Sequence, residues 1–266
     1  MDGIVNLGPL AFATDRLLAV ALLVGFVFAM DRIAAQASGR VRPATGLAIL
    51  AGLVVARVAF VLTYRDLFAR DWASAFAFWQ GGFNAWAGFL AAAVVLIWKA
   101  RPAAVMHRSL AALALFGTAW FAGSALLQQE PRPLPDLPSL ARLDGRQVTI
   151  DELADGPVVI NLWATWCPPC RRELPMLAEA AEDSDIPILL INQGEDGELV
   201  RNYLLANGVP GSAVLLDPPA SATRALGNAA LPTTLFIDAS GQLVATHVGE
   251  ISRAALAAQI NVLEGE

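Results

Sequence analysis

Four long apolar stretches in the first half of the chain constrain its fold more than any other feature. They cover residues 10–30, 44–64, 76–98 and 105–127. Each has about the length, 17 to 25 residues, that a helix needs to cross the hydrocarbon core of a bilayer. The whole chain is 56% hydrophobic and only 16% charged, which is too apolar for an ordinary soluble protein. The sequence therefore predicts a multi-span α-helical membrane domain with about four transmembrane helices.

The loops between these stretches predict how they are oriented. Basic residues gather in the loops after the first and third stretches, at Arg32, Arg40, Arg42, Lys99, Arg101 and Arg108. Cytoplasmic loops carry the excess of Lys and Arg, so we expect both ends of the helical domain on the periplasmic face of a bacterial inner membrane. The first stretch lacks a basic lead and precedes three others, so we expect it to be retained rather than cleaved.

A proline-rich segment separates the apolar half from the rest of the chain. Residues 129–138 read Gln-Glu-Pro-Arg-Pro-Leu-Pro-Asp-Leu-Pro, and prolines at this density oppose helix and favour an extended spacer. We therefore expect a transmembrane domain over 1–128, a linker over 129–138 and a second domain over 139–266.

Beyond the spacer, strand patterns alternate with helix patterns. Short apolar runs rich in β-branched residues occur at 157–163, 186–191, 213–216, 233–238 and 242–248. Helical patterns lie between them at 168–182, 196–207 and 220–226, and Ser252 is a candidate N-cap for a last helix. This order predicts an α/β domain with a mixed central sheet.

Charge and cysteine content narrow the function. A net charge of -6 and a pI near 5.0 offer no basic surface, so nucleic acid is not an expected partner. The only two cysteines are Cys167 and Cys170, and their spacing also occurs as half of a zinc site. A second half is missing, since the two histidines, His107 and His247, lie far from the pair in sequence. We expect no metal and no cofactor other than a redox-active disulfide.

The Cys-Pro-Pro-Cys run stands between a predicted strand and a predicted helix. This places Cys167 at a helix N-terminus, where free N–H groups and the helix dipole stabilise a thiolate. Cys170 lies one turn further into the helix and can attack a mixed disulfide on Cys167. Cys167 is therefore the expected nucleophile and Cys170 the resolving thiol.

Two motifs carry a resemblance to a known family. Trp-Cys-Pro-Pro-Cys at 166–170 is followed by Arg-Arg-Glu-Leu-Pro, and Leu-Pro-Thr-Thr-Leu-Phe stands at 231–236. Because of these two motifs, the chain from about residue 134 onward resembles the membrane-tethered, extracytoplasmic thioredoxin-like proteins of the TlpA and ResA type. The resemblance implies a thioredoxin fold, a cis peptide bond before Pro232 beside the disulfide, and a part for Leu231 in choosing substrates.

The same resemblance implies supporting roles for further residues. Glu173 matches an acidic residue that could tune the thiol pKa values or accept protons, although it could equally be a solvated carboxylate on the helix surface. Asn161 replaces a buried Asp of cytoplasmic thioredoxins, so proton transfer must rely on Glu173 or water. Trp166 is expected to shield the disulfide, Trp163 to pack in the core, and His247 to be a surface or structural residue.

The membrane half carries a second resemblance. The runs at 7–10, 56–64 and 78–90 are similar, in order, to the opening spans of prolipoprotein diacylglyceryl transferase. That family has a histidine where this chain has Trp86, and its later Gly-Arg-x-Gly-Asn-Phe run is absent here, so the activity is not implied. Arg57, which is costly inside an apolar span, is a candidate functional residue together with Gly81 and Gly82. Anchoring and lipid binding both remain open for this half.

These features predict a membrane-tethered protein-disulfide reductase that acts on exported clients through Cys167 and Cys170. The spans contain no cysteine, so electrons must come from a separate transmembrane dithiol donor. Membrane lipid is the third expected partner. Two alternatives remain: an oxidant or isomerase that uses the same dithiol, and a lipid- or lipoprotein-binding module that carries a redox domain.

Overall fold

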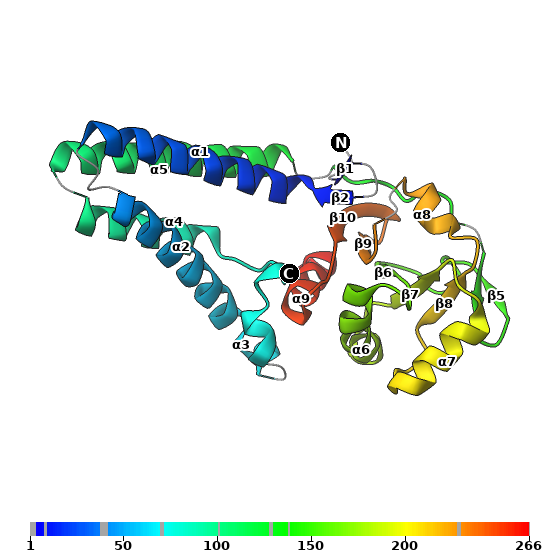
Figure 1. Cartoon of the computed structure of the whole chain (residues 1–266). Coiled ribbons are helices and arrows are strands. Elements are labelled where there is room, and N and C mark those ends of the chain that lie inside the picture. Colours follow the sequence, from blue (N-terminus) through cyan, green and yellow to red (C-terminus); the bar gives the residue numbers. More distant parts are fainter. Residues whose placement is uncertain are drawn as a thin grey trace. The chain divides into compact units, whose positions relative to one another are not determined.

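The computed structural model describes residues 4–7, 10–37, 42–69, 72–100, 102–127, 130–137, 139–227 and 230–265. Within it the chain forms two compact units (Figure 1). One is helical and covers residues 14–128. The other contains residues 129–266 together with residues 1–13.

The helical unit is built on four apolar helices. They are α1 (Thr14–Gln36), α2 (Arg42–Thr63), α4 (Ala85–Lys99) and α5 (Ala103–Leu126). The short helix α3 (Arg65–Phe68) follows α2. Within the described residues, Thr14–Gln36, Ala44–Thr63 and Ala103–Leu126 are long and apolar enough to cross a membrane. Most of their side chains face outward, as lipid-facing helices require.

Two of the expected spans differ from the observed helices. The first begins at Thr14, because Leu10–Ala13 forms strand β2 and pairs antiparallel with β1 (Ile4–Leu7). In place of the first part of the expected third span, the chain forms the 3-10 helices η1 (Trp72–Phe76) and η2 (Phe78–Gln80). Gly81 and Gly82 then take φ values of 76° and 80°, a left-handed conformation that ends helical structure. Asn84 caps α4, which is 15 residues long.

The second unit contains an eight-stranded mixed sheet in the order β3-β10-β9-β6-β7-β8-β4-β5. The long strands are β6 (Val158–Trp163), β7 (Ile188–Gln193), β8 (Val214–Asp217), β9 (Thr233–Ile237) and β10 (Gln242–Val248). The short strands are β3 (Arg132–Pro133) at one edge of the sheet, and β4 (Leu140–Arg142) and β5 (Gln147–Val148) toward the other edge. Strands β6, β7 and β8 are parallel, whereas β9 runs antiparallel to β6. Part of the proline-rich segment thus pairs with β10 at the sheet edge.

Three helices connect these strands and a fourth follows β10, and the sequence patterns predicted all four closely. They are α6 (Pro168–Asp183), α7 (Gly197–Asn207), α8 (Ser221–Ala225) and α9 (Arg253–Glu264). Ser252 caps α9 as expected, since its hydroxyl oxygen accepts a hydrogen bond from the Ala255 N–H at 3.2 Å. One buried cluster joins the sheet to α6, α7 and α9, and a second lies on the side of α8. These two cores hold β6 rigidly in the middle of the sheet, and β6 leads into the cysteine pair.

Candidate active site

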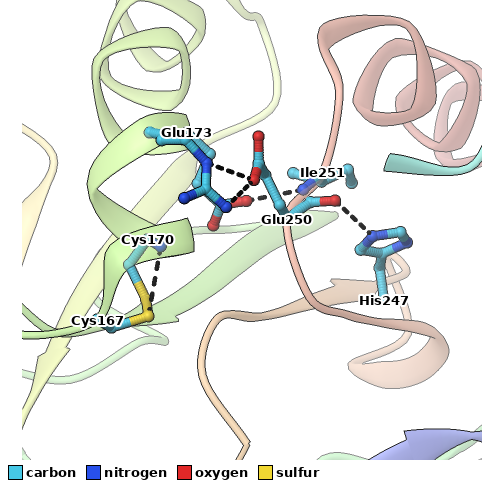
Figure 2. Close-up of polar contacts among 7 residues, drawn as sticks. Cys167, Cys170, Glu173, His247, Glu250 and Ile251 are labelled. Carbon is cyan, nitrogen blue, oxygen red and sulfur yellow. Dashed lines mark hydrogen bonds and ion pairs between the residues drawn. A yellow bond between two sulfur atoms is a disulfide. The ribbon is translucent and has the colours of Figure 1, made fainter. Parts of the chain in front are cut away.

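The cysteine pair lies at the start of α6, directly after the central strand β6. Cys167 is the N-cap residue of α6, and Pro168 occupies the first helical position, where no hydrogen-bond donor is needed. Cys167 and Cys170 form a disulfide, with 5.3 Å between their Cα atoms. Cys167 Sγ accepts a hydrogen bond from the Cys170 N–H at 3.3 Å (Figure 2). The helix N-terminus therefore directs a backbone donor at the first sulfur, which favours its thiolate after reduction.

The expected cis proline lies at the same end of the sheet. The Leu231–Pro232 peptide bond is cis, and Pro232 immediately precedes β9. Leu162, near the end of β6, pairs with Thr233 at the start of β9. β6 continues from Leu162 into the loop that carries the cysteines. The residues just before β9, which include Pro232, therefore lie beside that loop. Leu231 is partly buried and packs against the hydrophobic clusters on both sides of the sheet.

Glu173 and Asn161 come together in the interior. Glu173 is 3% exposed, and it shares a face of α6 with Cys170, one turn earlier. Its two carboxylate oxygens accept hydrogen bonds from the Asn161 side chain at 2.9 Å and from the Ile251 N–H at 2.7 Å. Burial raises the pKa of Glu173 to about 8, against the lowering effect of these two hydrogen bonds. The structure thus excludes the solvated-carboxylate interpretation of Glu173.

An ion pair adjoins this carboxyl group. Arg172 Nε and Nη2 donate to Glu250 Oε2 at 2.9 and 2.6 Å. Glu250 raises the pKa of Glu173 by charge repulsion, whereas Arg172 lowers it. His247 Nε2 lies 3.2 Å from the Glu250 carbonyl oxygen, which agrees with a structural position for this histidine. No local sequence pattern predicted the contact between Arg172 and Glu250, which are 78 residues apart.

A second carboxylate, also missed, holds the loop before the cysteines. Glu195 Oε2 accepts hydrogen bonds from the Thr165 N–H and from the Asn192 side chain, both at 2.7 Å. Its other oxygen accepts from the Thr165 hydroxyl. The parallel pairing of β6 and β7 brings the loops after these strands to one sheet edge. The pairing of β6 with β7 was therefore the signal that an acidic residue after β7 could contact the loop before the cysteines.

The two tryptophans near the motif differ in their surroundings. Trp163 is fully buried, and its ring lies 6.0 Å from that of Tyr203, which confirms the expected core position. Trp166, next to Cys167, is 67% exposed. An exposed aromatic side chain beside the dithiol offers apolar surface to a protein partner.

The candidate residues of the helical unit also lie together. Arg57 is buried in α2, and its guanidinium donates to the carbonyl oxygens of Gly81 and Gly82. Trp86 is exposed, and its ring stacks on that of Phe121 with 4.2 Å between the ring centroids. Backbone carbonyl groups thus act as the hydrogen-bond partners of the Arg57 guanidinium.

A dithiol on the N-terminal turn of a helix, fed by a central strand and next to a cis proline, defines a thioredoxin-fold thiol-disulfide oxidoreductase. Residues 129–260 match the redoxin family. The chain is 34% identical over 147 residues to "Thiol:disulfide interchange protein DsbE homolog" of Paracoccus denitrificans, covering 52% of this chain and 81% of that protein. This chain therefore belongs to the family of thiol:disulfide interchange proteins.

Two further proteins are similar to part of this chain. The chain is 28% identical over 124 residues to thiol-disulfide oxidoreductase ResA of Bacillus subtilis, covering 46% of this chain and 69% of that protein. A solved thioredoxin family protein from Chlorobium tepidum, also a thiol:disulfide interchange protein, aligns with a TM-score of 0.44 at 28% identity, over 51% of this chain and 97% of that one. Residues 7–125 match the prolipoprotein diacylglyceryl transferase family, so the predicted fusion is confirmed.

Proposed function

We propose that this protein is an extracytoplasmic disulfide reductase, anchored in the bacterial inner membrane, that reduces exported client proteins. The observation that carries the proposal is the placement of Cys167 as N-cap of α6, with the Cys170 N–H directed at its sulfur. The excess of basic residues over positions 32–42 and 99–108, around the α1–α2 and α4–α5 connections, supports an outward-facing redox unit.

The first step is attack of the Cys167 thiolate on one sulfur of a client disulfide. A bond forms between Cys167 Sγ and that sulfur, and the other client sulfur leaves as a thiolate, which takes up a proton from solvent. The N-terminal turn of α6 stabilises the attacking thiolate. Exposed Trp166 beside Cys167 supplies apolar surface for the client.

In the second step, Cys170 resolves the mixed disulfide. Its thiolate attacks Cys167 Sγ, forms the Cys167–Cys170 disulfide and releases the second client thiolate. The client thus gains two electrons and two protons. Glu173, whose pKa is raised to about 8, can take the proton from the Cys170 thiol when it is in its carboxylate form, and the fraction in that form rises as pH approaches the pKa. Asn161 holds this carboxyl group through its side-chain amide.

A separate transmembrane dithiol protein returns the pair to the reduced state. The chain contains only the two cysteines of the active site, so its own spans cannot carry electrons by thiol exchange. We assign the helical unit an anchoring role, because exposed Trp86 offers no group that could handle a proton in acyl transfer.

Trapping in the native host tests the proposal. Cys170→Ser removes the resolving thiol, so clients and the electron donor should accumulate as mixed disulfides on Cys167. These adducts should disappear with dithiothreitol. Cys167→Ser is the matched control, since it keeps one thiol in the motif but lacks the nucleophile. Equal trapping by both variants, or no adducts with Cys170→Ser, would contradict the assigned roles.

A further inference from the structure

Arg57 holds one segment of the helical unit through all its hydrogen-bond donors. A guanidinium has five N–H groups, and those of Arg57 reach the carbonyl oxygens of Ser74, Ala75, Ala77, Gly81 and Gly82. The distances range from 2.5 to 3.5 Å. The phenylalanine rings around the cation are those of Phe60, Phe68, Phe78 and Phe83, each 5.6 to 6.0 Å from Cζ. The charge is thus held without a carboxylate among these contacts.

The segment that Arg57 contacts, residues 72–83, lies beside the last turns of α2. Helices α2 and α4 run antiparallel, because the Asn84 N–H donates to the Ala56 carbonyl oxygen at 3.0 Å. One turn further along, a Cβ on Gly88 would lie 3.0 Å from the Gly52 carbonyl oxygen. Residues 72–83, which precede α4, therefore lie beside the part of α2 from Arg57 to Thr63.

That part of α2 belongs to a helix long and apolar enough to cross a membrane. The 15 residues of α4 rise about 22 Å at 1.5 Å each, less than the roughly 30 Å of a hydrocarbon core. Residues 72–83 cover the remaining depth beside α2. Between Trp72 and Trp98 the sequence has no Asp, Glu, Lys or Arg, as membrane depth requires.

Backbone that is not α-helical needs hydrogen-bond partners from within the protein at membrane depth, because lipid offers no hydrogen bonds. Arg57 supplies them for five carbonyl groups of this segment. The large side chains of the segment and of the start of α4 point outward, and the exposed ones are Trp72, Phe76, Phe78, Trp79, Phe83 and Trp86. They continue the exposed apolar surface of α2 and α4, which includes Leu53 and Val94.

We propose that residues 72–84 form the first part of the third membrane span, which is not α-helical and which Arg57 holds within the bilayer, with its aromatic side chains packed against lipid just below the headgroups. Trp and other aromatic side chains favour this zone, where an apolar ring meets the polar boundary. The occupant of this surface is therefore the membrane lipid itself. Gly82 belongs to the arrangement, since a Cβ there would lie 2.9 Å from Arg57 Nη1 and 2.5 Å from the Phe60 ring.

Spin labels in reconstituted vesicles test the proposal. In a Cys167→Ser, Cys170→Ser background, a label is placed by Trp79→Cys and the protein is reconstituted in phosphatidylcholine and phosphatidylglycerol. Asp66→Cys, in a side chain 93% exposed beyond the end of α2, provides the water reference, and Val94→Cys in α4 the lipid reference. Collision with dissolved oxygen reports lipid, and collision with a nickel chelate reports water.

The label at position 79 should match the Val94 label, with high oxygen accessibility and a loss of nickel accessibility relative to the Asp66 label. Nickel accessibility equal to that of the Asp66 label would overturn the proposal. Low accessibility to both reagents would also overturn it, because a protein surface would then cover the segment.

Arg57→Lys tests the part assigned to the guanidinium, since the ammonium keeps the charge but has fewer donors. The position 79 label should then gain nickel accessibility and mobility. Gly82→Ala disturbs the same contacts from the other side and should act alike. Unchanged accessibility in both variants would overturn the role of Arg57.

Discussion

Two opposing effects act on the pKa of the Glu173 carboxyl group. Its two oxygens accept hydrogen bonds that favour the carboxylate, yet burial favours the neutral acid and raises its pKa to about 8. The Asn161 Oδ1 atom is buried and has no hydrogen-bond partner among the described residues. A half-turn of that amide would present the oxygen to a protonated Glu173. The pair can therefore accommodate both protonation states of the carboxyl group.

Glu173→Gln should remove a pH dependence of both stability and rate. The pKa rises from an ordinary 4.5 to about 8 on folding, so the folded oxidised protein binds more protons than the unfolded chain between these values. Its unfolding free energy should then fall as pH rises through this window, by at most about 1.4 kcal/mol per pH unit. Denaturation at several pH values, with exposed Glu182→Gln as control, measures this.

The same variant should lose the proton acceptor for Cys170. We expect the wild-type rate of disulfide exchange to rise with pH through the pKa of Glu173, and the Glu173→Gln profile to lack that step. An unaltered profile in Glu173→Gln would argue against its part in proton transfer.

Glu195 acts on the loop that carries Cys167. Glu195→Gln places an amide N–H₂ opposite hydrogen-bond donors of Thr165 or Asn192, which should cost about 1 to 3 kcal/mol of stability. Chemical denaturation of the oxidised protein measures the loss. Glu182→Gln on the exposed side of α6 should change stability by less than about 0.5 kcal/mol. Equal stability of the two variants would show that the Glu195 contacts do not hold the loop.

At the scale of elements, local signals predicted most of the second unit. The α6 helix follows from Pro168 at its first turn, and α9 from the Ser252 cap. Long-range contacts could not be predicted, because neither the Arg172–Glu250 pair nor the Glu195–Thr165 contact leaves a local pattern. In the helical unit, hydropathy predicted apolar segments but not that Gly81 and Gly82 would end helical structure at the expected third span.

The α9 cap provides a test at this scale. Ser252→Ala removes the acceptor for the Ala255 N–H and should lower the unfolding free energy by about 1 kcal/mol. Ser139→Ala, in an exposed position before β4, is the control and should change it by less than about 0.5 kcal/mol. The urea midpoints of the two variants give the comparison, and a smaller loss for Ser252→Ala would contradict the cap assignment.

For the whole molecule, the positions of the basic loops predict the side of the membrane on which the dithiol lies. Cys167 and Cys170 are the only cysteines, so thiol labelling reports on the redox unit alone. After mild reduction of spheroplasts, a membrane-impermeant maleimide should label the protein without permeabilisation. Labelling that appears only after permeabilisation would place the redox unit in the cytoplasm instead.

The direction of electron flow decides whether the protein is a reductase or an oxidant. Equilibration of the Cys167–Cys170 pair with glutathione buffers measures its reduction potential. A reductase should lie well below about -180 mV, nearer the roughly -270 mV of thioredoxin than the roughly -120 mV of a strong oxidant. A value well above about -180 mV would contradict the proposed reduction of exported client proteins.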